Sequence, residues 1–331
     1  MEQRAIGRLG RKVSVVGLGT WQLGADWGQV DDSDALAILD AAVKNGVTLL
    51  DTADVYGDGR SERLIGRYLA ETGADRGADG ILVATKMGRR VEQRPEHYTL
   101  DNFRAWTDRS RSNLGVDTLD LVQLHCPPTP VYGTQAVYDA LDTLVAEGRI
   151  AAYGVSVETC DEALAAIARP GVATVQIILN ALRRKPLERV LPAARDAGVG
   201  IIARVPLASG LLSGKFRSDT TFAANDHRNY NRHGEAFDVG ETFSGVDYET
   251  GVAAAQEFAA LVPDGLTPAQ AALRWVVQQP GVTTVIPGAS SVAQAVANAE
   301  AAGAPPLPDE TLAAVEDLYD RRIRAQVHHR W

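Results

Sequence analysis

The chain is poor in cysteine: only Cys126 and Cys160 occur among its 331 residues. Two thiols do not make the disulfide framework on which small secreted scaffolds depend. A chain of this length buries a core large enough to be stable without such cross-links. We therefore expect both cysteines to be reduced and the protein to be cytoplasmic.

Long apolar runs and an excess of basic residues are also missing. No stretch approaches the roughly 20 apolar residues that span a bilayer, and the opening MEQRAIGRLGRK lacks the apolar core of a signal peptide. Lysine and arginine number 33 against 42 aspartates and glutamates, giving a formal net charge of −9. Nonspecific nucleic-acid binding needs a basic surface. We expect neither a membrane nor a nucleic acid as partner, and the oligomeric state is not predicted.

Several common functional motifs are absent. There is no HExxH and no Cys/His cluster at metal spacing, so no metal site is expected. VGLGTWQLG begins like a Rossmann fingerprint at Gly17 and Gly19, but Gln22 stands where the third glycine belongs. Cys126 follows His125 directly, and neighbouring strand residues point to opposite faces, so we expect a structural thiol. Four histidines are expected to be solvated surface residues: His227, His233, His328 and His329.

What the sequence does contain is a regular alternation of buried strands and helices. Eight short aliphatic runs, typical of strands buried on both faces, begin at Val13, Val47, Ile81, Leu119, Ala151, Thr174, Val199 and Thr283. Helical segments lie between them and end at glycines such as Gly46, Gly148 and Gly198. Helix, glycine and strand in repetition indicate βαβ units and a parallel sheet.

Eight such units without a linker favour an α/β fold, a single (β/α)₈ TIM barrel domain over residues 1–331. The N-terminal segment predicts a short hairpin around Gly7 to Gly10. A long loop from Phe216 to Tyr248 follows the seventh strand; it is polar and aperiodic, and loops of that length are usually functional or disordered.

Polar residues close several of the predicted strands, at the barrel end where chemistry is found in this fold. Asp51, Lys86 and His125 end three successive strands, and Tyr56 follows on the next turn. Each alone has a plain structural reading: a helix cap, a packed phenol, a surface charge or a core imidazole. Together they predict convergence at one rim.

These motifs resemble those of the aldo-keto reductase family along nearly the whole chain. The similarity includes DTADVYG.G.SE..IG from Asp51 to Gly66, and LDLVQLH ending at His125. It continues through PLASGLLSGK from Pro206 to Lys215 and VIPGASSVAQAVAN from Val285 to Asn298. The resemblance implies a catalytic tetrad at Asp51, Tyr56, Lys86 and His125.

The chemistry of carbonyl reduction suits these four residue types. A nicotinamide supplies the hydride, and a tyrosine can supply the proton although its ordinary pKa is near 10. A neighbouring ammonium such as Lys86 favours the phenolate and should lower the pKa of Tyr56, with Asp51 holding the lysine. His125 would orient the carbonyl and donate a hydrogen bond to its oxygen.

The resemblance also implies a dinucleotide across the rim, NADP(H) by preference with NAD(H) open. Gly19, Thr20 and Trp21 would line the pocket, although Trp21 has an equal reading as plain core. Ser156 and Gln176 would bind the nicotinamide amide, with Asn180 nearby. The pyrophosphate loop and the adenosine end would be held by Pro206, Leu207, Ser209, Gly210, Leu211, Lys215, Pro287, Gly288, Ser290, Gln294 and Asn298, with a helix starting at Gly288 to Ser290.

Two positions depart from the family pattern. Arg204 stands where most members place an aromatic ring that stacks on the nicotinamide; a guanidinium can also stack, and a structural ion pair is the competing reading. Ser290 and Ser291 stand where many members hold the 2′-phosphate with a basic residue, and Lys215 or Arg217 would have to supply charge.

The sequence therefore predicts an NADP(H)-dependent reductase of aldehydes and ketones. The alternative is a catalytically weak regulatory subunit that binds the cofactor and reports redox state; a barrel of unrelated chemistry, such as an isomerase, has the fold without the motifs. Substrate specificity should lie in the long loop and in Cys126 to Gly133, with Trp27 and Tyr132 as candidate walls.

Overall fold

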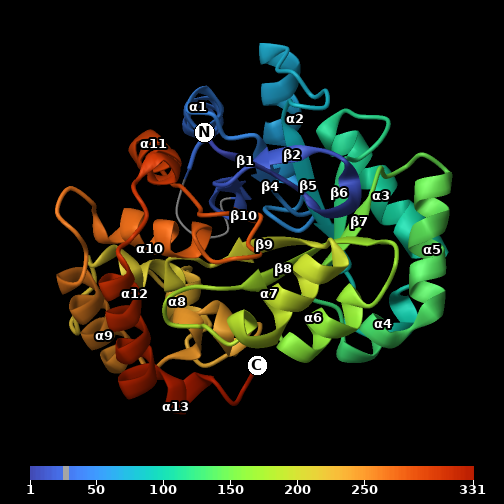
Figure 1. Cartoon of the computed structure of the whole chain (residues 1–331). Coiled ribbons are helices and arrows are strands. Elements are labelled where there is room, and N and C mark those ends of the chain that lie inside the picture. Colours follow the sequence, from blue (N-terminus) through green and yellow to red (C-terminus); the bar gives the residue numbers. More distant parts are fainter. Residues whose placement is uncertain (25–29) are drawn as a thin grey trace.

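A computed structural model describes residues 1–24 and 30–331. Within that part of the chain, eight parallel strands form one sheet, ordered as they occur in the sequence (Figure 1). They are β3 (Leu18–Gly19), β4 (Leu49–Asp51), β5 (Leu82–Met87), β6 (Leu121–His125), β7 (Tyr153–Ser156), β8 (Val172–Ile178), β9 (Gly200–Arg204) and β10 (Thr284–Val285).

The sheet closes on itself, as the predicted barrel requires. Parallel bridges pair Val16 with Val285 and Gly19 with Gly288, next to β3 and β10. The Gly17 amide donates to the Val285 carbonyl at 2.8 Å, which ties the first strand region to the last. The predicted (β/α)₈ fold is thus confirmed.

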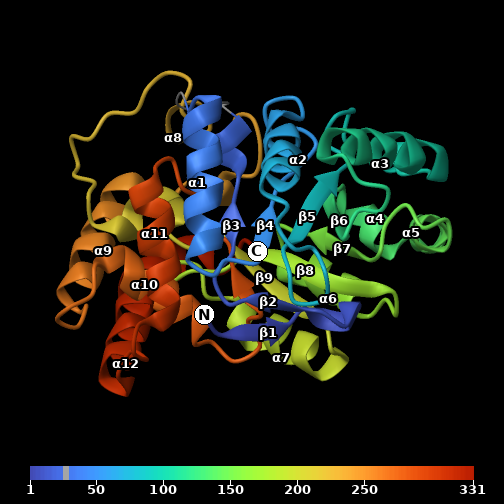
Figure 2. The same cartoon turned by 90° about the horizontal axis from the view of Figure 1, so that it is seen from above.

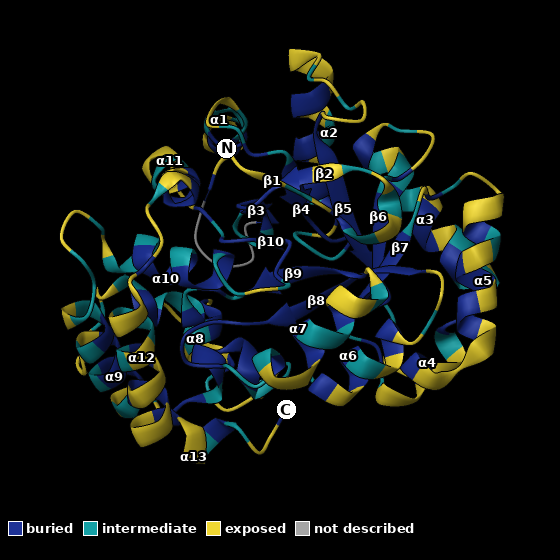
Figure 3. Cartoon of the chain, in the orientation of Figure 1, coloured by how far each residue is buried: buried dark blue, intermediate teal, exposed yellow. Residues whose placement is uncertain are grey.

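Helices surround the barrel, and their outer faces are exposed while the strands are buried (Figure 3). Those between barrel strands are α1 (Asp32–Lys44), α2 (Arg60–Thr72), α3 (Leu100–Leu114), α4 (Thr129–Gly133), α5 (Gln135–Ala146), α6 (Cys160–Ile167), α7 (Pro186–Ala197), α8 (His227–Tyr230), α9 (Tyr248–Ala260) and α10 (Pro268–Val277). Three more follow β10: α11 (Val292–Glu300), α12 (Asp309–Leu318) and α13 (Arg324–Val327). No helix in the described ranges is long and apolar enough to cross a membrane.

The helix boundaries follow capping chemistry. The side chain of Asp31 accepts a hydrogen bond from the Asp34 amide and begins α1, and Gly46 follows the helix with a left-handed φ of +88°. Helix α11 begins at Val292 with Ser291 as its cap. The expected start at Gly288 to Ser290 is therefore wrong, because the capping hydroxyl is that of Ser291.

The N-terminal hairpin covers the end of the barrel opposite the carboxyl ends of the strands (Figure 2). It pairs β1 (Gln3–Ala5) with β2 (Lys12–Ser14) in antiparallel fashion, so the first apolar run is divided between the hairpin and β3. Gly7 lies so close to β8 and β9 that an added Cβ would be 1.9 Å from the Ala173 carbonyl oxygen. Ile6 and Val13 pack with barrel-interior residues such as Leu49 and Leu82, and so fill the lower barrel.

Residues 216–248 lie where the long loop was expected, between the 3₁₀ helix Ala208–Ser213 and α9. The segment contains α8 and two 3₁₀ turns, Val239–Glu241 and Phe243–Gly245. Phe222, Phe243 and Tyr248 pack their rings together at centroid distances of 5.0 to 6.0 Å. The contacts among these aromatic rings therefore order a segment whose sequence shows neither helix nor strand periodicity.

Candidate active site

The ends of β4, β5 and β6 bring three polar side chains to one rim. Asp51 closes β4, Lys86 lies on β5 and His125 closes β6. All three residues are buried, and the adjacent strands pair in register, with Lys86 opposite Gln123. Because neighbouring parallel strands present their carboxyl ends together, the sequence placed these groups correctly.

Lys86 is the centre of this group. Its Nζ donates to Asp51 Oδ2 at 2.6 Å and to the Thr52 carbonyl at 2.9 Å. The same ammonium lies 3.3 Å from the Tyr56 hydroxyl. A buried ammonium therefore joins a carboxylate to a phenol, as the tetrad reading requires.

The turn that carries Tyr56 depends on a glycine. Gly57 has a φ of +58°, and a Cβ added there would lie 2.1 Å from the carbonyl oxygen of Gly24. Only glycine allows this close approach of two backbone segments. The turn thereby fixes where the Tyr56 hydroxyl lies relative to Lys86.

Electrostatics keep the tyrosine in its neutral form. Burial raises the pKa of Tyr56 above its ordinary value, and the Lys86 ammonium offsets only part of that rise. The sequence expectation had the contribution of Lys86 right in sign, but the net direction is opposite because burial of the phenol is the larger effect. Burial lowers the pKa of Lys86, but Asp51 and Tyr56 together raise it by more. The net pKa is above the ordinary value, so the lysine stays charged.

His125 faces Tyr56 edge to face, with ring centroids 5.9 Å apart. Burial, together with the charges of Arg89 and Lys86, holds the pKa of His125 well below its usual range. Its Nδ1 is buried and has no hydrogen-bond partner within the described ranges. A neutral imidazole can donate a hydrogen bond from one of its ring nitrogens.

Gln176 and Ser156, expected at the nicotinamide amide, lie on β8 and β7 beside the tetrad. The Gln176 side-chain nitrogen donates to Asp51 Oδ1 at 2.7 Å, so this residue supports the tetrad carboxylate directly. The Ser156 hydroxyl accepts from the Cys126 thiol at 3.4 Å. Asn180 donates to the Val205 carbonyl and to Ser244, which ties it to the long segment.

The expected phosphate-binding residues form two neighbouring groups on the rim. In the first, Ala208, Ser209 and Gly210 all have positive φ, which curves the backbone within the stretch Pro206–Lys215. Leu211 is fully buried, whereas Lys215 is exposed. In the second, Ser290 and Gln294 hydrogen-bond to each other and Asn298 donates to the Gly288 carbonyl, below the solvent-facing start of α11.

The residues expected to line the pocket after β3 divide into two kinds. Thr20 is fully buried and donates to the Asp51 carbonyl at 2.8 Å. The Trp21 ring stacks near Tyr56, with centroids 6.1 Å apart and planes 22° apart. Trp27 lies outside the described residues.

Other predictions at the rim are corrected. His227 was expected at the surface, but it is 2% exposed and its ring lies 5.1 Å from that of Trp21. Tyr132 was a candidate pocket wall; it is 1% exposed and its hydroxyl donates to the Ser156 carbonyl, so it supports the rim from behind.

The thiol of Cys126 also differs from its expected place. Cys126 has a φ of +47°, which breaks the strand alternation and turns the thiol towards the rim. Burial raises the pKa of Cys126 to about 12, so the thiol stays protonated. A protonated thiol is a poor nucleophile, so the expectation of a structural thiol rests on burial and not on strand alternation.

Arg204 has the ion-pair environment that was its competing reading. It is 7% exposed and pairs with Glu158 at 2.9 Å and with Glu241 at 2.6 Å. Sequence reasoning missed both carboxylates. Glu158 stands two residues beyond the end of β7 and was findable as another polar residue near a strand end, whereas Glu241 lies in the aperiodic segment and carries no signal.

The family model for the aldo/keto reductase family matches residues 15–320. The chain belongs to the aldo/keto reductase family. Aldo-keto reductase YhdN of Bacillus subtilis is 30% identical over 92% of this chain and 89% of its own length. Among curated relatives, a probable voltage-gated potassium channel subunit beta of Arabidopsis thaliana is 28% identical over 93% of both chains.

Solved structures agree with this membership. The glycerol dehydrogenase AKR11B4 of Gluconobacter oxydans superposes with a TM-score of 0.76 at 29% identity, covering 97% of this chain and 96% of its own. An aldo-keto reductase of Klebsiella pneumoniae in complex with NADPH gives 0.69 at 26% identity, covering 96% of each chain.

Proposed function

We propose that this aldo/keto reductase converts aldehydes or ketones to alcohols with NADPH as hydride donor and Tyr56 as proton donor. The observation that carries the proposal is the 3.3 Å separation between Lys86 Nζ and the Tyr56 hydroxyl, with Asp51 at 2.6 Å on the other side of the ammonium.

The rim residues fit a dinucleotide. The consecutive positive φ angles at Ala208, Ser209 and Gly210 curve the backbone of this stretch at the rim. The first turn of α11 holds no acidic residue, and Ser290 before it is exposed, so the positive end of that helix is accessible to a phosphate. The NADPH complex of the Klebsiella relative supports the phosphorylated cofactor, with Lys215 and Arg217, both exposed, as sources of charge.

When bound, the cofactor supplies a hydride to the carbonyl carbon. The carbonyl oxygen, which gains negative charge, would accept a hydrogen bond from His125, whose buried ring stays neutral. Tyr56 then gives its proton to that oxygen, and the Lys86 ammonium stabilises the phenolate that remains. Asp51, anchored by Gln176, holds Lys86 in place. Trp21 and Phe237, with ring centroids 5.9 Å apart, would exclude water from the reacting groups.

The direct test is consumption of the reduced cofactor. Wild-type protein is titrated with NADPH and with NADH by fluorescence, and a panel of aliphatic and aromatic aldehydes and ketones is then assayed at 340 nm. We expect tighter binding of NADPH and turnover of at least one carbonyl class. Tight NADPH binding without turnover of any member of the panel contradicts the catalytic proposal.

The similarity to a potassium channel subunit supports a second candidate, a regulatory subunit that binds the cofactor and senses redox state. It predicts tight cofactor binding, negligible turnover and one stable partner protein. A pull-down run beside the turnover assay separates the two candidates.

A further inference from the structure

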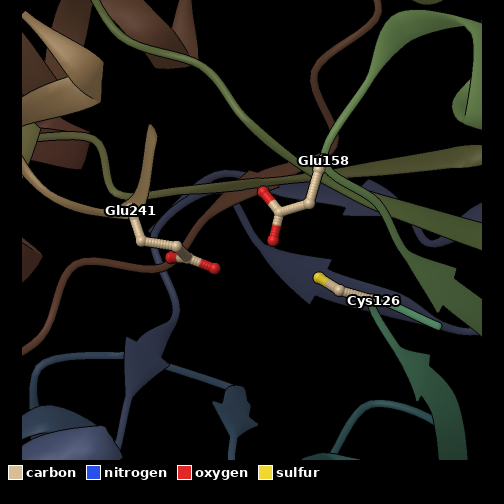
Figure 4. A group of neighbouring side chains, drawn as sticks. All are labelled: Cys126, Glu158 and Glu241. Atoms are coloured by element: carbon tan, nitrogen blue, oxygen red, sulfur yellow. The ribbon is translucent and has the colours of Figure 1, made fainter. Parts of the chain in front are cut away.

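A cluster of acidic and thiol side chains lies beside the tetrad. Cys126, Glu158 and Glu241 place their ligand-type atoms within 4.8 Å of one another, and the two carboxylates face each other (Figure 4). The guanidinium of Arg204 contacts all three. Its Nη1 lies 2.6 Å from Glu241, and its Nη2 lies 2.9 Å from Glu158 and 3.7 Å from the Cys126 sulfur. The place that a metal cation would take is therefore filled by the arginine.

This cluster lies close to the reacting groups. Cys126 follows His125 in the chain, and Arg89 bridges the two groups by donating to the His125 carbonyl at 3.1 Å and pairing with Glu158 at 3.5 Å. The charge of Glu241 is near enough to raise the pKa of Tyr56 as a minor contribution beside burial. Arg204 is thus a buried guanidinium close enough to the tetrad for its charge to lower the pKa of His125.

The pKa values of Glu158 and Glu241 depend on each other's charge and on that of Arg204. Burial raises the pKa of Glu158 to about 7, with Glu241 adding to the rise and Arg204 opposing it. Burial alone would raise the pKa of Glu241, but Arg204, Arg89 and a hydrogen bond from Glu158 lower it, so Glu241 is the ionised partner. Glu241 therefore faces Arg204 as a carboxylate supplied by the protein itself.

Glu241 reaches this place from residues 216–248, far from Arg204 in the sequence. The Ser209 hydroxyl donates to the Glu241 carbonyl at 3.0 Å and accepts from the Phe243 amide at 3.0 Å, which fixes the backbone on both sides. The Glu241 side chain is 11% exposed. It lies against Arg204 as the carboxylate of an anionic substrate would.

We propose that Glu241 is a specificity-determining residue that occupies the anion-binding face of Arg204 and makes the enzyme select uncharged carbonyl compounds over carboxylate-bearing ones. A guanidinium beside a pocket is otherwise a strong, directional site for a carboxylate. When Glu241 occupies the Arg204 guanidinium, a substrate carboxylate is no longer attracted to the arginine and is repelled by the charge of Glu241. The site then discriminates against anionic substrates through an unfavourable contact. The inference rests on the proposed reductase function.

The test compares two aldehydes that differ only in a carboxylate, benzaldehyde and 4-carboxybenzaldehyde. For the wild type we expect kcat/KM at least tenfold higher with benzaldehyde. Glu241→Ala exposes Arg204 Nη1 and should narrow that ratio at least tenfold. In the Glu241→Ala/Arg204→Met double variant, which has no guanidinium to bind the carboxylate, the kcat/KM ratio should return towards the wild-type value. Glu249→Ala, at an exposed position of α9, serves as the matched control.

A binding measurement makes the inference independent of turnover. Benzoate is titrated by tryptophan fluorescence, with benzyl alcohol as the uncharged comparison. Glu241→Ala should bind benzoate at least tenfold more tightly than wild type does, with benzyl alcohol unchanged within a factor of three. Glu241→Ser, whose short side chain also vacates the Arg204 guanidinium, replaces the alanine variant if thermal melting shows that the latter is unfolded.

Equal kcat/KM values for the two aldehydes in the wild type would overturn the inference. So would a folded Glu241 variant with unchanged benzoate affinity and an unchanged aldehyde ratio. Absence of turnover with both aldehydes and with every member of the wider carbonyl panel would refute the proposed reductase function instead. The benzoate titration would then still decide whether Glu241 closes an anion site.

Discussion

The side-chain nitrogen of Gln176 donates a hydrogen bond of 2.7 Å to Oδ1 of Asp51. The other oxygen of that carboxylate accepts from Lys86, so the barrel core anchors both ends of Asp51. A glutamine on β8 that the family resemblance assigns to the cofactor is therefore also part of the support for the tetrad. One hydrogen-bond network therefore connects Gln176, Asp51 and Lys86.

Replacing Gln176 by methionine should destabilise the protein by about 2 kcal/mol, because a buried charged acceptor loses one donor. Gln135→Met is the matched control: Gln135 also donates to a carboxylate, that of Asp139 at 2.8 Å, but at the surface. Its loss should cost under about 1 kcal/mol. Urea unfolding of both variants checks this, and equal losses would show that Asp51 does not depend on Gln176.

The Asp51–Lys86 pair predicts a separation of stability from activity. Lys86→Met leaves Asp51 as a buried, uncompensated charge and should cost about 3 to 5 kcal/mol. Adding Asp51→Asn removes that charge and should recover most of the lost stability, while turnover stays absent because no ammonium faces Tyr56. Chemical denaturation and aldehyde reduction are measured on both variants; a double variant that regains activity contradicts the role given to Lys86.

The pH dependence follows from the shifts at Tyr56 and His125. The pKa of Tyr56 is raised, so the proton donor remains protonated through neutral pH and is lost only in strongly alkaline solution. The pKa of His125 is well below its usual range, so the His125 imidazole stays neutral from about pH 6 upward. The reductive kcat/KM should be flat from about pH 6 to 9, whereas alcohol oxidation, which needs the phenolate, should rise with pH. A bell-shaped reductive profile centred near pH 7 would refute this assignment.

Asp54, in the turn before Tyr56, should make stability depend on pH. It is fully buried, both its carboxylate oxygens lack hydrogen-bond partners in the described part of the chain, and burial raises its pKa to about 7. The folded protein then holds a proton that the unfolded chain releases from about pH 4 upward, so stability falls as pH rises from about 4 to 7. Since one pKa unit corresponds to roughly 1.4 kcal/mol, the loss is about 4 kcal/mol.

Asp54→Asn should therefore raise the melting temperature at pH 8 and leave it nearly unchanged at pH 4. Asp264→Asn, at an exposed position, is the control and should have little effect at either pH. Differential scanning fluorimetry at the two pH values checks the prediction. A variant that is destabilised equally at both would mean that Asp54 is ionised and paired in the folded protein.

The barrel and the tetrad were predictable because both depend on local pattern. Strands that are buried on both faces have consecutive aliphatic residues, as in the run before His125. The polar residue that ends each strand lies at the rim because the strands of this fold are parallel. The family motif then fixed Tyr56 on its glycine turn. The run beginning at Val13 was harder, since one apolar stretch serves the hairpin and β3.

The pairing of Arg204 with Glu241 and the burial of His227 could not be predicted in the same way. Both depend on how residues 216–248 fold back on the rim. Aromatic packing and the ion pair of Glu241 hold that segment in place, and these contacts join residues that are distant in sequence. The net shift of the Tyr56 pKa was missed for a related reason: the sequence shows that a lysine is near, but not how deeply the phenol is buried.

Conversion of Tyr56 to phenylalanine tests the central claim most directly, because it removes only the oxygen that Lys86 faces. Tyr98→Phe is the matched control, since the hydroxyl of Tyr98 donates to Gln93 outside the tetrad. We predict that Tyr56→Phe lowers kcat/KM for aldehyde reduction by at least a hundredfold, with NADPH affinity unchanged within a factor of three and Tyr98→Phe still active. A Tyr56→Phe enzyme that reduces aldehydes at the wild-type rate would contradict the account.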